Sequence, residues 1–182
     1  KYNLSTWKGE LCSTCELFTS KDYSFLPVGR IVTSGGMKAI RAYYESLGNE
    51  YIDAFNDMLV LDALICNTDR HFGNFGFLID NKTNKIVAPA PLFDHGNSLF
   101  NFAGQDALGS NDSMTEYVNT LMPCVYDDFI GTAKAVLTPK HREGLRHLLE
   151  FKFEKHSRYN LPAKRLRLME RQIRERAKLL LQ

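Results

Sequence analysis

Three polar residues in two short segments have the types and spacing needed for phosphoryl transfer. Asp69 and Asn74 are separated by four residues, and Asp94 follows in the segment Phe93-Asp94-His95-Gly96. Phosphoryl transfer requires a carboxylate that orients and deprotonates the acceptor hydroxyl, and oxygen ligands that hold magnesium on the phosphates. We therefore predict Asp69 as the catalytic base, and Asn74 and Asp94 as ligands of Mg²⁺ and, through it, of ATP.

His71 is a further candidate catalytic residue because it lies between the predicted base and Asn74. It could contact the transferred phosphate, or it could brace the loop through a backbone carbonyl, and the sequence leaves both roles open. Arg70 is better placed to pair with a carboxylate than to reach the substrate. Asp62 lies in an apolar stretch and needs a partner if it is buried. We expect that partner among the backbone N–H groups of the loop at 67–74.

The elements expected around these residues support the prediction. Residues 50–66 are apolar on nearly every side in their second half, which predicts a buried helix that ends just before the loop. Residues 75–79 and 85–88 predict two strands joined by a polar turn. This hairpin returns the chain to the loop, so that Asp94 can reach the ion held by Asn74. The same interval and order occur in protein kinases, where a magnesium-binding Asp-Phe-Gly follows the catalytic loop.

Residues 67–77 and 88–98 resemble the HipA-like kinases, bacterial serine/threonine kinases with a fold related to the phosphoinositide lipid kinases. In both families an Arg-His pair follows the catalytic Asp. The resemblance implies a mainly α (α+β) C-terminal lobe of a kinase-like fold, with helices around a catalytic loop and a β-hairpin. It also implies ATP- and Mg²⁺-dependent transfer to a serine or threonine hydroxyl of a protein substrate. A toxin–antitoxin role, with an antitoxin or a DNA-binding protein as partner, is raised by the family but not decided by these residues.

The phosphate-covering half of a kinase site is absent from the sequence. There is no Gly-x-Gly-x-x-Gly, no Gly-x-x-x-x-Gly-Lys, and no lysine in a Val-Ala-Ile-Lys-like strand ahead of the loop. We therefore expect residues 34–182 to be the C-terminal lobe. Residues 1–33 are expected to lead into it, with a strand near 10–18 entering the hinge that contacts adenine. A missing N-terminal lobe is then a required partner, and the isolated chain is expected to be inactive.

Composition is typical of one soluble domain without a membrane partner. The chain has 182 residues, 44% hydrophobic and 24% charged, with a net charge of +2. No apolar run approaches the roughly 18 residues of a membrane span, so we expect a cytoplasmic protein. The Cys12-Ser13-Thr14-Cys15 motif lacks the second ligand pair of a zinc site, and free thiols are expected.

The remaining segments are expected to be mostly helical, at 34–47, 138–151 and 163–181, with a mobile loop at 104–113. Asn97 and Ser98 are expected only to cap a turn. The last helix has an apolar stripe and a basic face that could bind nucleic acid or an acidic partner, or could simply be solvated. The basic residues are Lys164, Arg165, Arg167, Arg171, Arg174, Arg176 and Lys178. A lipid kinase, a non-catalytic interaction module and a nucleic-acid-binding regulator therefore remain alternative functions.

Overall fold

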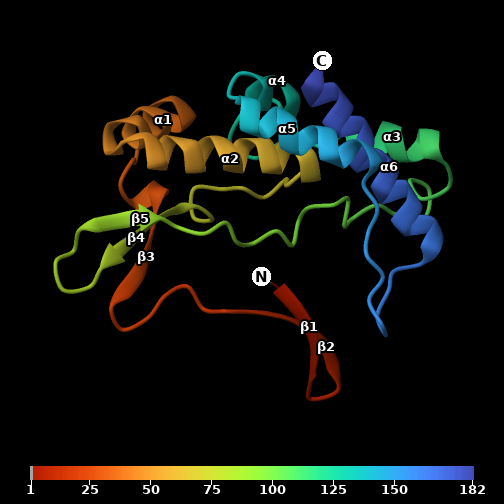
Figure 1. Cartoon of the computed structure of the whole chain (residues 1–182), viewed down its shortest axis with the longest axis horizontal. Coiled ribbons are helices and arrows are strands. Elements are labelled where there is room, and N and C mark those ends of the chain that lie inside the picture. The colour runs from red at the N-terminus through yellow and green to blue at the C-terminus, as the bar shows by residue number, and fades with distance from the viewer. Residues whose placement is uncertain (1) are drawn as a thin grey trace.

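The computed structural model describes residues 2–182, and over that range it is an α+β fold (Figure 1). The helices form a layer along one side, and two small antiparallel sheets lie on the other. In chain order the elements are β1 (Tyr2–Trp7), β2 (Glu10–Cys15), β3 (Tyr23–Pro27), α1 (Gly36–Leu47), α2 (Asn49–Ile65), β4 (Gly76–Asp80), β5 (Ile86–Pro89), α3 (Asn111–Asn119), α4 (Phe129–Lys134), α5 (Pro139–His147) and α6 (Ala163–Leu181). Short 3-10 turns at Val28–Arg30 and Leu148–Glu150 complete them.

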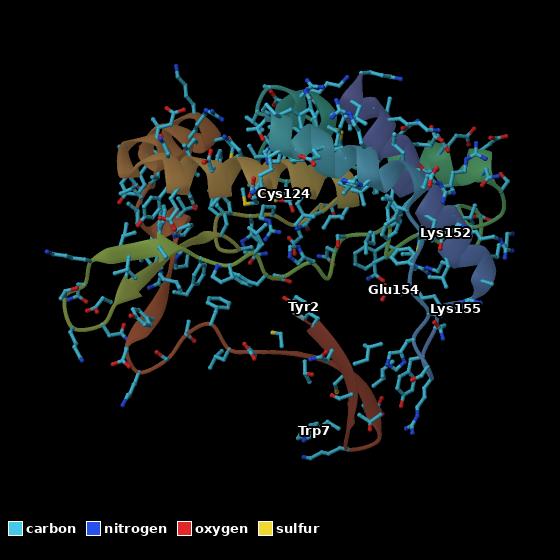
Figure 2. The ribbon with its side chains drawn as sticks, in the orientation of Figure 1. Tyr2, Trp7, Cys124, Lys152, Glu154 and Lys155 are labelled. Carbon is cyan, nitrogen blue, oxygen red and sulfur yellow. The ribbon has the colours of Figure 1, made fainter. Side chains whose placement is uncertain are left out.

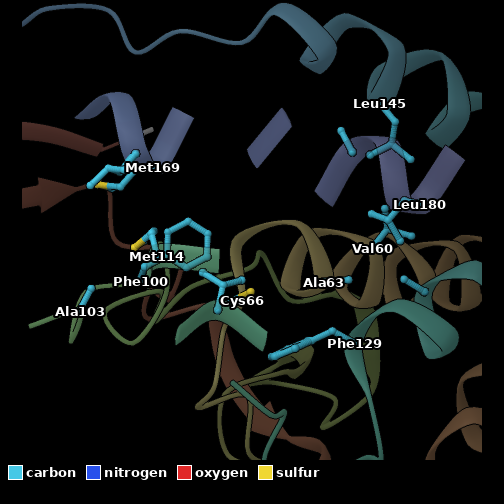
Figure 3. Close-up of a cluster of buried hydrophobic side chains, with 14 residues drawn as sticks. Val60, Ala63, Cys66, Phe100, Ala103, Met114, Phe129, Leu145, Met169 and Leu180 are labelled. Atoms are coloured by element: carbon cyan, nitrogen blue, oxygen red, sulfur yellow. The ribbon is translucent and has the colours of Figure 1, made fainter. Parts of the chain in front are cut away.

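Helix α2 is the centre of the fold and contacts α1, α4, α6 and β5. One apolar cluster packs its C-terminal half, through Val60 and Ala63, against α4, α5 and α6 (Figure 3). A second cluster packs Phe55 and Met58 against α1 and the three-stranded sheet. The predicted buried helix is confirmed, and it ends because Cys66 adopts a left-handed conformation that turns the chain into the loop.

The predicted hairpin is also present, but it belongs to a three-stranded sheet in the order β3-β4-β5. Strand β3 pairs antiparallel with β4, with Phe25 opposite Leu78. No strand was predicted at 23–27, and the structure adds this segment to the predicted hairpin as a third strand. A Cβ atom at Gly76 would lie 2.2 Å from the carbonyl oxygen of Leu26, so only glycine lets the two strands approach this closely.

The expected strand near 10–18 is present but shorter than predicted. Strand β2 ends at Cys15 and pairs only with β1 to form an N-terminal hairpin. This hairpin extends away from the helical layer and exposes apolar side chains such as Tyr2 and Trp7, the latter 64% exposed (Figure 2). Exposed apolar side chains that lie together on a protein surface are typical of interaction sites.

Two expectations about the C-terminal half are corrected by the structure. The predicted loop at 104–113 ends early, because Ser110 caps α3 and helical structure begins at Asn111. The predicted helix at 138–151 is α5 followed by a 3-10 turn, whereas α6 has the expected bounds. Within residues 2–182, no helix has the length and apolar character required to cross a membrane.

Candidate active site

The loop between α2 and β4 carries Asp69, His71 and Asn74, and hydrogen bonds within the loop fix its shape. The side-chain amide of Asn67 accepts a hydrogen bond from the N–H of Asp69 at 3.2 Å. The amide nitrogen of Asn74 donates to the Asp69 carbonyl at 3.0 Å, which leaves the Asn74 amide oxygen available to a cation. Asn74 is only 5% exposed, so its orientation is set by the fold rather than by solvent.

Arg70 joins this loop to the segment that carries Asp94. One guanidinium nitrogen, Nη1, donates to the carbonyl of Asn74 at 3.0 Å and to the carbonyl of Phe93 at 2.8 Å. The same side chain pairs with Asp62 through two bonds of 2.9 and 3.0 Å, and both residues are 0% exposed. One buried cation therefore joins the backbone at Asn74 to the backbone of Phe93, the residue directly before Asp94.

The pairing of Asp62 differs from the expectation. Backbone N–H groups of the loop were expected as partners of Asp62, whereas its carboxylate accepts from Arg70 and from the side-chain amide nitrogen of Asn67. The preference of Arg70 for a carboxylate over substrate is confirmed. A bidentate guanidinium–carboxylate pair satisfies both charges where water cannot reach them.

Two backbone segments run side by side next to Asp69. The N–H and hydroxyl of Thr68 donate to the carbonyl of Asn97 at 3.1 and 3.2 Å, and the N–H of Leu99 donates to the carbonyl of Ile65 at 2.7 Å. The side-chain amide of Asn97 donates to Oδ2 of Asp69 at 2.9 Å. The expectation that Asn97 only caps a turn is therefore wrong. Ser98 does fit that role, since its hydroxyl donates to the carbonyl of His95 at 2.6 Å.

Asp94 lies exposed at the end of the segment and has a left-handed backbone with φ of 57°. Aspartate adopts this conformation more readily than most non-glycine residues, because its short polar side chain can hydrogen-bond locally. No group of three or more His, Cys, Asp or Glu side chains that could hold a metal occurs in the described part of the chain. A magnesium ion on ATP needs only one or two carboxylates besides the phosphates, so Asp94 and Asn74 fit that ion.

The two histidines of the site have different environments. His71 is exposed, and its Nδ1 accepts a hydrogen bond from the N–H of Gly73 at 3.0 Å. It therefore braces the loop through an N–H group, not through the carbonyl that was expected, and its contact with phosphate stays a prediction. His95 lies within 3.1 Å of Arg70, and burial together with the Arg70 charge lowers the pKa of its imidazole. His95 is thus neutral at physiological pH and can accept from the guanidinium.

Aromatic packing ties the N-terminal region to the segment that carries Asp94. The ring of Phe93 lies 5.3 Å from that of Phe18 and 5.1 Å from that of Phe25, measured between centroids. Phe18 precedes β3 and Phe25 lies within it. Edge-to-face and tilted contacts at these distances add to simple burial. The aromatic residue before Asp94, rather than the histidine after it, therefore packs the segment against its neighbours.

The sequence analysis missed Asn67 and Asn97 as members of the site. Both lie within the segments used for the family resemblance, but an asparagine in a loop is common and its hydrogen-bond partner is not visible from spacing. The available signal was their position, at the first residue of the loop for Asn67 and three residues after Asp94 for Asn97.

The basic face of α6 is largely occupied by internal contacts. Arg176 is buried and donates to the carbonyl of Ala63, and Arg165 donates to the carbonyl of Asn101. Lys164 and Arg174 likewise donate to the backbone carbonyls of Gly109 and Phe151. Four of the seven basic residues of α6 are therefore engaged with backbone carbonyls of the chain itself.

Comparison with known proteins finds similarity both in sequence and in structure. No model of a known protein family matches the chain. Over 111 residues it is 30% identical to the serine/threonine-protein kinase CtkA of Helicobacter pylori, an alignment that covers 53% of this chain and 34% of that protein. The chain thus matches about a third of the length of this curated relative.

The crystal structure of the proinflammatory kinase CtkA of H. pylori superposes with a TM-score of 0.73 at 18% identity. The superposition covers 100% of this chain and 78% of the CtkA chain. The predicted α+β, kinase-like fold is therefore confirmed. The chain has the fold of a serine/threonine kinase and is similar in sequence to one over about half of its length.

Proposed function

We propose that this chain carries the catalytic-loop and metal-binding half of a kinase that transfers the γ-phosphoryl group of ATP to a serine or threonine hydroxyl of a protein. Asp69 accepts the proton of the acceptor hydroxyl, and Asn74 and Asp94 hold the magnesium ion. The bound ion offsets the charge of the phosphates. The substrate class follows from similarity to CtkA, and a lipid hydroxyl is the alternative acceptor.

One observation carries the proposal: Arg70 bonds the carbonyls of both Asn74 and Phe93. Two loops that are separated in sequence by a hairpin are thereby held at one place, with Asp69 between Asn74 and Asn97. Phosphoryl transfer depends on positioning and electrostatics more than on covalent chemistry. A rigid, buried link between the base loop and the metal loop supplies that positioning.

A small lobe is needed to complete this site. The sequence contains no phosphate-covering glycine loop, and the hairpin β1–β2 exposes Tyr2, Leu4 and Trp7. We propose that these side chains pack against an N-terminal lobe that supplies the glycine loop and its lysine. The isolated chain should then fold but transfer no phosphate, and titration calorimetry with ATP and magnesium should detect weak binding at most.

The test of the catalytic proposal is Asp69→Asn in a protein that joins this chain to its N-terminal lobe. A general base contributes roughly 10²- to 10⁴-fold in rate, so labelled-phosphate incorporation should fall by that factor while circular dichroism stays unchanged. Asp53→Asn is a matched control, because Asp53 is an exposed residue of α2 outside the loop. Activity near the parental level in Asp69→Asn would contradict the role of Asp69. Incorporation into phosphoinositide vesicles but not into proteins would favour the lipid kinase.

A second candidate function, nucleic-acid binding, is favoured by a groove of about 660 Å³ along α6. Its lining includes Arg167, Arg171 and Lys152, the last of which lies on the segment before α6 (Figure 2). Within residues 2–182 neither arginine has a hydrogen-bond or ion-pair partner. If the groove binds DNA, fluorescence anisotropy should show affinity that falls steeply between about 50 and 200 mM salt. The double variant Arg167→Ala/Arg171→Ala should make DNA affinity less dependent on salt concentration. An unchanged salt dependence would exclude this role for the groove.

A further inference from the structure

We propose that Asn97 is a positioning residue that holds the carboxylate of Asp69 in its productive orientation and couples that orientation to the Asp94 segment. This inference rests on the proposed role of Asp69 as the base. It concerns a residue that neither the motif spacing nor the comparisons assign to the site.

The contact is direct and polar. Nδ2 of Asn97 donates to Oδ2 of Asp69 at 2.9 Å, and both side chains are half-buried. The other hydrogen bonds of Asp69 involve its backbone: its N–H donates to Asn67, and its carbonyl accepts from His71 and Asn74. Within residues 2–182, Asn97 is therefore the residue whose hydrogen bond fixes the orientation of the Asp69 side-chain carboxylate. With Oδ2 engaged, Oδ1 is the oxygen left to face an acceptor hydroxyl.

Asn97 is itself held rigidly by the backbone around it. Its carbonyl accepts from the N–H and the hydroxyl of Thr68, the residue before Asp69. The next two residues are also fixed, Ser98 by its bond to the carbonyl of His95 and Leu99 by its bond to the carbonyl of Ile65. A side chain that projects from such a segment has few alternative positions. It can therefore orient the base without a large loss of entropy when substrate binds.

The position of Asn97 also links the base to the metal. Asp94 lies three residues earlier in the same segment. Any displacement of that segment would move Asn97 and, through its hydrogen bond, the carboxylate of Asp69. Because misplacement of a reacting group by about 1 Å can cost on the order of 100-fold in rate, this link makes base alignment dependent on an intact metal loop.

The experiment compares Asn97→Ala, Asn97→Asp and Asn97→Gln in the protein that joins this chain to its N-terminal lobe. Asn97→Asp keeps the size of the side chain but replaces the donor by a second carboxylate. Asn119→Ala is the control, because Asn119 is an exposed asparagine at the end of α3. Urea unfolding measures the stability of each variant, and steady-state kinetics from pH 5 to 9 give kcat and the KM for ATP.

We expect Asn97→Ala to lower kcat by roughly 10- to 100-fold with little change in the KM for ATP, since the base is misaligned but the nucleotide site is kept. Asn97→Asp should also move the acidic limb of the pH–rate profile to higher pH. A second carboxylate beside Asp69 makes it harder for both groups to be ionised at once. Asn97→Gln, which keeps a donor, should recover part of kcat.

Parental kcat in Asn97→Ala and Asn97→Asp, alongside an inactive Asp69→Asn, would overturn the inference and leave the proposed function intact. A kcat loss in Asn97→Ala that equals the loss of folded protein would overturn it as well. Activity retained in Asp69→Asn would instead refute the catalytic role of Asp69, and the role of Asn97 with it.

Discussion

Replacing Arg70 by methionine should cost more stability than any surface charge substitution in this chain. Arg70 and Asp62 are both 0% exposed, and the guanidinium makes two bonds of 2.9 and 3.0 Å to the carboxylate. Arg70→Met leaves that carboxylate buried and without its counter-charge, for which the expected loss is about 3–5 kcal/mol. An exposed pair such as Lys178–Glu175 is worth about 0–1 kcal/mol.

The structure also predicts how this loss can be relieved. In the double variant Asp62→Asn/Arg70→Met the buried charge is gone, while the new amide still offers an oxygen to Asn67, which now donates to Asp62. The double variant should therefore be more stable than Arg70→Met alone, and the two substitutions should be non-additive by on the order of 2 kcal/mol. Urea unfolding of the chain, followed by far-UV circular dichroism, gives each free energy of unfolding.

Activity separates the structural role of Arg70 from its role in the site. The double variant still lacks the donor that joins the carbonyls of Asn74 and Phe93, so phosphotransfer in the complete kinase should stay low although stability returns. A loss below about 1 kcal/mol in Arg70→Met would refute the buried-pair reasoning, because only a solvated pair is that weak. Parental activity in the double variant would refute the idea that Arg70 holds the two loops together.

Three further outcomes follow from individual contacts. Because burial lowers the pKa of His95 below its ordinary value of 6.5, the folded protein binds fewer protons than the unfolded chain below that pH, and stability is lost as pH falls. His95→Gln should weaken the dependence of the free energy of unfolding on pH in this range. An unchanged dependence would contradict the lowered pKa of His95. Within residues 2–182 the buried hydroxyl of Tyr126 has no hydrogen-bond partner, so Tyr126→Phe should leave the free energy of unfolding equal or raise it by about 1 kcal/mol; a clear loss would contradict this. Asp94→Ala should reduce activity more than Asn74→Ala, since it removes a charged ligand, and high magnesium should partly restore both; unchanged metal dependence would place the ion elsewhere.

Local sequence determined the elements that carry the predicted site. The apolar stretch that became α2, the two strands of the hairpin and the bounds of α6 follow from periodicity and turn residues, which act between near neighbours. The order of base loop, hairpin and Asp94 is likewise fixed by the chain. Phosphoryl transfer is predicted from the residue types of Asp69, Asn74 and Asp94 alone. The individual roles of these residues stay predictions.

Tertiary structure alone decided which side chains meet. The pairing of β3 with β4, the ion pair of Arg70 with Asp62 and the bond of Asn97 to Asp69 join residues that no sequence period relates. The basic residues of α6 also show that sequence does not identify contacts. Arg176 belongs to the face that could be solvated, but its side chain is buried and donates to the backbone carbonyl of Ala63. Such contacts depend on the packing of whole elements around α2. Desolvation favours a partner for most buried polar groups, and that partner is set by proximity in space.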